Sequence, residues 1–125
     1  MPKDPTTIII EGQALSLNFM GFDQYHEPPE ELSESVRTFA RMIKGLTEET
    51  EAIDWYEQRM SVEKNSDAKE IMKNAQTEEM KHFSMDLEFL IRQKPEWKTV
   101  LQNVLFHEGN IVELGEKAEK KADQD

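Results

Sequence analysis

Residues 32–60 read LSESVRTFARMIKGLTEETEAIDWYEQRM, and their apolar pattern decides the fold. Apolar side chains recur at intervals of four and three residues, the spacing of a helix that buries one stripe against a partner. We therefore predict a long helix from about residue 30 to about residue 63, roughly 50 Å long at 1.5 Å per residue, in which Gly45 is a tolerated weak point. The stripe consists of Leu32, Val36, Phe39, Ile43, Leu46, Ile53 and Met60.

Turn and cap residues divide the chain beyond this helix. Residues 65–67 (Asn-Ser-Asp) have turn and N-cap chemistry, and an apolar stripe resumes at Ala68 and continues to Leu90, which predicts a second helix that folds back on the first. Pro95 begins a third, shorter helix that ends near Gly109. The expected fold class is therefore all-α, a two-helix hairpin followed by a short helix.

The two ends of the chain differ from this helical region, which we place at residues 30–108. Residues 1–29 form an arm whose β-branched patch, Thr6–Ile10, could be a short strand or disordered. Residues 109–125 form a charged tail. Within it, Glu113–Asp125 is charged and nearly without large apolar side chains, so we expect this segment to be frayed or disordered.

A two-helix hairpin cannot close a bundle alone, because one neighbour covers an apolar stripe incompletely. Pairing of two hairpins into a four-helix bundle is the simplest solution. We therefore expect a homodimer.

Composition excludes several classes of function. The chain has 125 residues and a net charge of −11, so that it would repel nucleic-acid phosphates. With no Cys, any metal must be held by oxygen and imidazole. No apolar run approaches the roughly 18 residues that span a membrane, and no secretion signal is evident, so we expect a soluble protein.

Two acidic positions suggest a metal site. Glu79 and His82 form a Glu-x-x-His pair whose spacing lets both side chains touch one ion, although a surface Glu beside a His would look the same. Glu49 is aligned with the apolar stripe of the first helix, where a carboxylate needs a metal, a raised pKa or a basic partner. Asp86, one turn beyond His82, could orient the imidazole ring or supply another oxygen.

Together these residues are half of a known constellation. Dinuclear carboxylate sites in helical bundles use two Glu from two helices and a Glu-x-x-His motif from each of the other two. This chain offers one lone Glu, Glu49, and one such motif, Glu79 and His82. A twofold axis between paired hairpins would supply the other half and place two metals at the subunit interface.

These residues resemble the encapsulated ferritins, which are ferroxidases packaged inside encapsulin shells. The similarity is strongest over Glu48–Arg59 (EETEAIDWYEQR) and Glu78–Leu90 (EEMKHFSMDLEFL) and extends roughly over residues 26–108. The resemblance implies that Glu49, Glu79 and His82 bind iron across a dimer interface. It also implies that Tyr56 donates a hydrogen bond to these ligands without binding iron itself.

The family also has an outer site that attracts metal, which here corresponds to Glu48, Glu51 and flanking Trp55. Offsets of three, four and seven residues place the three side chains on one helical face, and Glu48 points about 100° away from Glu49. A solvated acidic helix face would show the same pattern.

The resemblance implies oxidation of Fe²⁺ to Fe³⁺ with dioxygen or peroxide as acceptor, two irons per dimer, and sites that Zn²⁺, Mn²⁺ or Ca²⁺ can also occupy. It further implies a ring-like oligomer of dimers in the cytoplasm, inside an encapsulin shell. The family's usual packaging tail is not recognisable, and Ile111–Leu114 or the N-terminal arm are the candidate replacements. Two other functions stay open: a non-catalytic acidic hairpin that mediates oligomerisation, and a peroxidase or dimanganese catalase.

Overall fold

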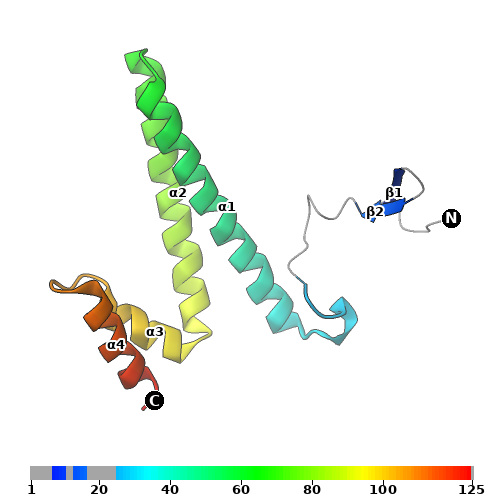
Figure 1. Ribbon diagram of the computed structural model, residues 1–125, viewed down its shortest axis with the longest axis vertical. Coiled ribbons are helices and arrows are strands. Elements are labelled where there is room, and N and C mark those ends of the chain that lie inside the picture. Colours follow the sequence, from blue (N-terminus) through cyan, green and yellow to red (C-terminus); the bar gives the residue numbers. More distant parts are fainter. Residues whose placement is uncertain (1–6, 11–12, 17–24, 125) are drawn as a thin grey trace.

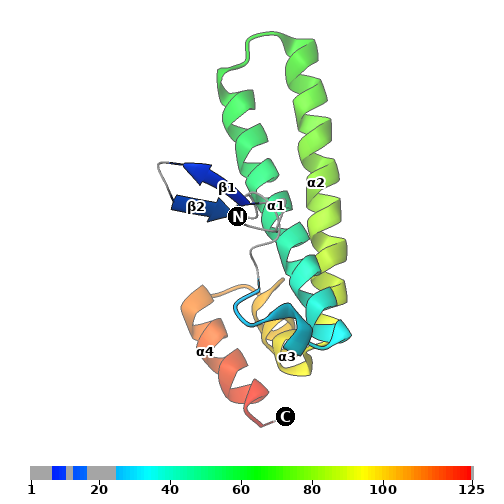
Figure 2. The same cartoon turned by 90° about the vertical axis from the view of Figure 1, so that its right-hand side faces the viewer.

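A computed structural model of the chain describes residues 7–10, 13–16 and 25–124. In Figures 1 and 2 two long helices form a hairpin, and two shorter helices form a second pair at one of its ends. This arrangement confirms the predicted helical fold class. The helices in the described part of the chain are α1 (Glu34–Val62), α2 (Ser66–Arg92), α3 (Pro95–Val104) and α4 (Ile111–Ala122).

Polar side chains define where the long helices begin. The Ser33 hydroxyl accepts a hydrogen bond from the Val36 amide at 3.2 Å, so α1 starts at Glu34, and a single 3₁₀ turn at Pro29–Glu31 replaces the helical turn expected from residue 30. The Asn65 side chain likewise accepts from the Ala68 amide at 2.9 Å. The predicted cap at residue 65 is therefore confirmed, and the hairpin connection is short enough to keep α1 and α2 adjacent.

The prediction of a frayed or disordered tail at Glu113–Asp125 is wrong for residues 113–122, which belong to α4. The Asn110 side chain caps α4 by accepting from the Glu113 amide at 3.1 Å, and α4 packs on α3. Leu114 is half-buried and Ala118 is completely buried. A small buried side chain lets two helices approach closely without a large apolar stripe, which is why the charged composition was misleading.

The described part of the N-terminal arm forms a hairpin of two short strands. Strand β1 (Thr7–Ile10) pairs antiparallel with β2 (Gln13–Ser16), so that Thr7 lies opposite Ser16. Of the two alternatives that the sequence left open for Thr6–Ile10, the short strand is therefore correct for Thr7–Ile10. The remainder of the arm expected at residues 1–29, namely residues 1–6, 11–12 and 17–24, lies outside the described residues.

The core of a single chain is thin. Among the described residues, Leu90 and Ala118 are the buried apolar side chains. Gln76 is also buried and joins the long helices by donating hydrogen bonds to the Ile53 carbonyl at 3.1 Å and to Glu57 Oε2 at 2.8 Å. Several large apolar side chains of α1 and α2 remain exposed, which is typical of a surface that another molecule covers. No helix in the described ranges has the length and apolar character that a membrane span requires.

We predict that Leu90→Ala lowers the free energy of unfolding by about 2–5 kcal/mol, because it leaves a cavity where the side chain is 0% exposed. Urea unfolding followed by circular dichroism measures the loss. Leu105→Ala is the matched control, since Leu105 is 42% exposed and its truncation should cost much less. Equal losses in the two variants would contradict this description of the core.

Candidate metal centre

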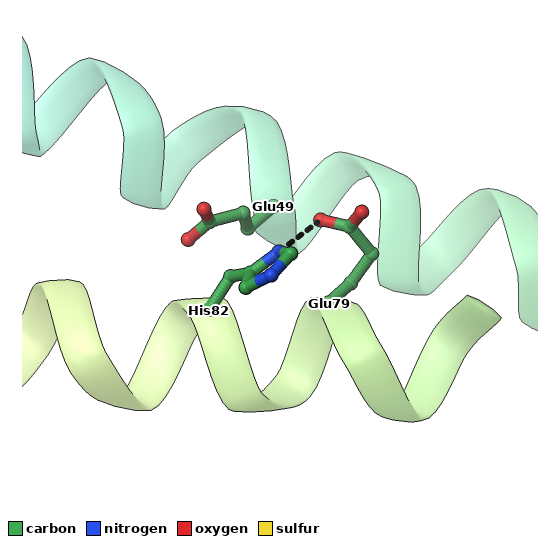
Figure 3. Close-up of side chains that lie close together, drawn as sticks. All are labelled: Glu49, Glu79 and His82. Atoms are coloured by element: carbon green, nitrogen blue, oxygen red, sulfur yellow. Dashed lines mark ion pairs between the residues drawn. The ribbon is translucent and has the colours of Figure 1, made fainter. Parts of the chain in front are cut away.

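The long helices bring Glu49, Glu79 and His82 together. Glu49 comes from the middle of α1, while Glu79 and His82 come from adjacent turns of α2, and all three side chains point into the space between the helices (Figure 3). Each side chain offers one ligand atom, and these atoms lie within 4.8 Å of one another. Within the described ranges, no other set of three or more His, Asp or Glu residues meets this condition. The geometry fits a cation held by two carboxylates and one imidazole.

The pair on α2 leaves space for such a cation. His82 Nδ1 lies 3.9 Å from Glu79 Oε2, which is longer than a hydrogen bond (Figure 3). The side chains of His82 and Glu79 are 45% and 28% exposed. The two ligands are therefore neither locked to each other nor enclosed by the single chain, and they remain accessible from one side.

Glu49 is the most constrained member of the set. Its Oε2 atom is buried and has no hydrogen-bond partner. Burial is the largest cause that raises the pKa of Glu49 from 4.5 to about 7, followed by the hydrogen bond and the charge of Asp86, and then by the charges of Glu79 and Glu48. A buried carboxylate among other carboxylates is costly, and a bound cation would relieve both the desolvation and the repulsion.

Asp86 and Gly45 complete the surroundings of Glu49. Asp86, for which the sequence left two roles open, contributes a hydrogen bond to Glu49. A Cβ atom built on Gly45 would lie 3.1 Å from Asp86 Oδ2. The helical pattern alone identifies Gly45 only as a weak point. Its position one helical turn before Glu49 is visible in the sequence, whereas its contact with Asp86 of α2 is visible only in the structure.

The outer acidic residues lie on the exposed face of α1. Glu48 and Glu51 are exposed, as is Trp55, and they belong to no set of three clustered ligands in the described part of the chain. Tyr56 is half-buried, and the guanidinium carbon of Arg59 lies 5.4 Å from the centre of its ring. The roles expected for these residues stay predictions.

Comparisons with known proteins agree on one family. The EncFtn-like family model matches residues 24–108. A "Ferritin-like protein" of Thermotoga maritima is 41% identical over 95 residues, which span 76% of this chain and 83% of the relative. An "Encapsulated ferritin-like protein" of Rhodospirillum rubrum is 37% identical over 89 residues, spanning 71% of this chain and 64% of the relative. The crystal structure of protein ne0167 from Nitrosomonas europaea is similar with a TM-score of 0.68 and 38% identity, over 71% of this chain and 98% of that one.

The raised pKa of Glu49 predicts a pH dependence of stability for the metal-free protein. Between pH 4.5 and about 7 the folded chain keeps a proton on Glu49 that the unfolded chain has lost, so the free energy of unfolding should fall as pH rises through this window. Glu49→Gln, which stays neutral, should remove this fall, of the order of 1 kcal/mol. Denaturant unfolding in chelator at several pH values measures the effect.

The matched control is Glu51→Gln on the exposed face of α1, which should keep the pH dependence of the unsubstituted protein. If Glu49→Gln shows the same pH dependence as Glu51→Gln, the explanation from the buried Glu49 carboxylate is wrong.

Proposed function

This chain belongs to the EncFtn-like family, and from that premise we propose that it is a ferroxidase, which oxidises Fe²⁺ to Fe³⁺ at a di-iron site formed between two copies of the chain. The observation that carries the proposal is the convergence of Glu49, Glu79 and His82, whose ligand atoms lie within 4.8 Å of one another. Carboxylate oxygens and imidazole suit iron in both oxidation states. The family's ferritin-like character and this donor set together support iron as the substrate.

The number of ligands supports a site shared between subunits. A bundle-type dinuclear centre uses two lone Glu and two Glu-x-x-His motifs, and one chain offers half of each. A second copy related by a twofold axis would add the partner's equivalent half. The chain alone would hold metal weakly, and dimerisation would complete the coordination.

An exposed apolar stripe beside His82 supports the same arrangement. Ile71, Met85 and Phe89 are exposed, and their spacing places them within about 60° of His82 around the axis of α2. Contiguous exposed apolar side chains such as these typically mark a surface that binds another molecule. A second hairpin packed on this stripe would bury its apolar side chains and would bring a second set of ligands toward the first.

The proposed chemistry assigns binding and geometry to the protein and electron transfer to the substrate. Each Fe²⁺ gives up one electron, so two neighbouring irons supply an electron pair that dioxygen or peroxide accepts. The carboxylates of Glu49 and Glu79 stabilise the ferric product because hard anionic oxygen prefers the higher charge. Imidazole from His82 helps to hold the ferrous ion without adding further negative charge.

Three accessory features belong to the same proposal. Exposed Glu48 and Glu51, flanked by Trp55, would attract Fe²⁺ from solution toward the site. Tyr56 would donate a hydrogen bond to the ligands. The name of the Rhodospirillum rubrum relative, "Encapsulated ferritin-like protein", supports enclosure in an encapsulin shell inside the cell, which would receive the ferric product. Within the shell the dimers would assemble into a ring-like oligomer.

We predict that the purified protein, given Fe²⁺ in air, develops ferric absorbance. Glu49→Ala, Glu79→Ala and His82→Ala should each lower the initial rate by at least about tenfold, because each removes one iron ligand. Glu70→Ala, an exposed carboxylate elsewhere on α2, is the matched control and should keep the full rate. Equal rates in all four variants that do not exceed the rate of Fe²⁺ without protein would instead support a non-catalytic acidic hairpin.

A second prediction tests whether assembly creates the site. Met85→Lys places a charge on the apolar stripe beside His82, so native mass measurement should show fewer dimers, and tight binding of one metal per chain should be lost although all three ligands remain. Met80→Lys is the matched control, because Met80 is 44% exposed but lies on a different side of α2 from Met85. Full metal binding by monomeric Met85→Lys would contradict a shared site.

A further inference from the structure

A glycine in the middle of α1 has an unusual neighbour. Gly45 lies four residues before Glu49, so the two positions share a helical face. Glycine weakens a helix interior relative to alanine, so its presence here needs a compensating reason. A Cβ atom at this position would lie 3.1 Å from Asp86 Oδ2 and 3.9 Å from Asp86 Cγ. The carboxyl group of Asp86 therefore lies against α1 where an ordinary side chain would begin.

Asp86 lies near the metal ligand from this position. It follows His82 by one turn of α2, and hydrogen bonding with its carboxyl group and the charge of that group both help to raise the pKa of Glu49. Figure 3 shows the Glu49 carboxylate on the His82 side of the cluster, away from Glu79. The Glu49 side chain therefore points toward the part of α2 that follows His82, and Asp86 lies in that part.

We infer that Gly45 and Asp86 are positioning residues for Glu49: the space at Gly45 admits the Asp86 carboxyl group to α1, and this group orients the Glu49 side chain beside His82. The inference rests on the metal site proposed above and adds two residues that support a ligand without binding iron. A ligand oriented in advance loses less conformational freedom when the metal arrives. Removing that support should weaken metal binding while all three ligands are retained.

The experiment measures Zn²⁺ affinity by calorimetry and the absorption spectrum of bound Co²⁺, without oxygen, on the full chain. Gly45→Ala should displace the Asp86 carboxyl group, weaken Zn²⁺ binding by about tenfold or more and alter the Co²⁺ spectrum. Gly115→Ala is the matched control: it is also a helical glycine, but a Cβ there meets nothing within 4 Å. Gly115→Ala should leave both measurements unchanged.

A double-mutant cycle tests whether Gly45 acts through Asp86. Asp86→Ala alone should weaken Zn²⁺ binding as Gly45→Ala does, and the two substitutions together should cause no further loss. Asp86→Asn, which keeps the shape and can still hydrogen-bond Glu49, should retain most of the affinity. If Gly45→Ala does not fold, the comparison of Asp86→Ala with Asp86→Asn decides the question, because only a positioning role predicts rescue by Asn.

Two results would overturn the inference. One is a Gly45→Ala protein with the Zn²⁺ affinity and Co²⁺ spectrum of the unsubstituted chain. The other is an equal loss from Gly45→Ala with and without Asp86. In both cases an unsubstituted protein that binds metal and oxidises Fe²⁺ leaves the proposed function intact, whereas failure of the unsubstituted protein to bind Zn²⁺ or Co²⁺ would refute the metal site itself.

Discussion

A half-buried carboxylate in the seam between two helices is the constraint on which this structure depends. Glu49 occupies a position of α1 that the apolar stripe would otherwise fill, and its Oε2 atom is buried without a hydrogen-bond partner. Burial and three neighbouring acidic side chains raise its pKa to about 7, because they disfavour the charged form. A cation between Glu49, Glu79 and His82, as proposed above, would favour the charged form and offset this cost.

The same face of the hairpin connects the site with assembly. In the described part of the chain the core is thin, and exposed apolar side chains on α2 flank His82. Covering them would bury apolar surface and would also exclude water from the ligands, which strengthens the attraction between carboxylates and a cation. The proposed dimer and the proposed metal site would therefore stabilise each other.

The family match and the arrangement of the chain divide the molecule into two parts. Residues 24–108 contain α1, α2 and α3 and match the EncFtn-like family, whereas α4 lies beyond that match and packs on α3. The site draws all of its clustered ligands from α1 and α2. Helix α4 therefore contributes none of these clustered side chains. It packs on α3 and forms with it the short helical pair at the end of the hairpin.

The sequence by itself determined the two long helices, the cap at Asn65, and the pairing of Glu79 with His82, because helical periodicity and capping depend on residues three or four positions apart. It also singled out Glu49, since a carboxylate in an apolar stripe is visible in the pattern. Only the tertiary structure decided that Asp86 meets Gly45 and Glu49, and that a charged tail forms α4 on α3. Those contacts join different helices, and their existence depends on how far one helix slides and rotates against another, which no local spacing records.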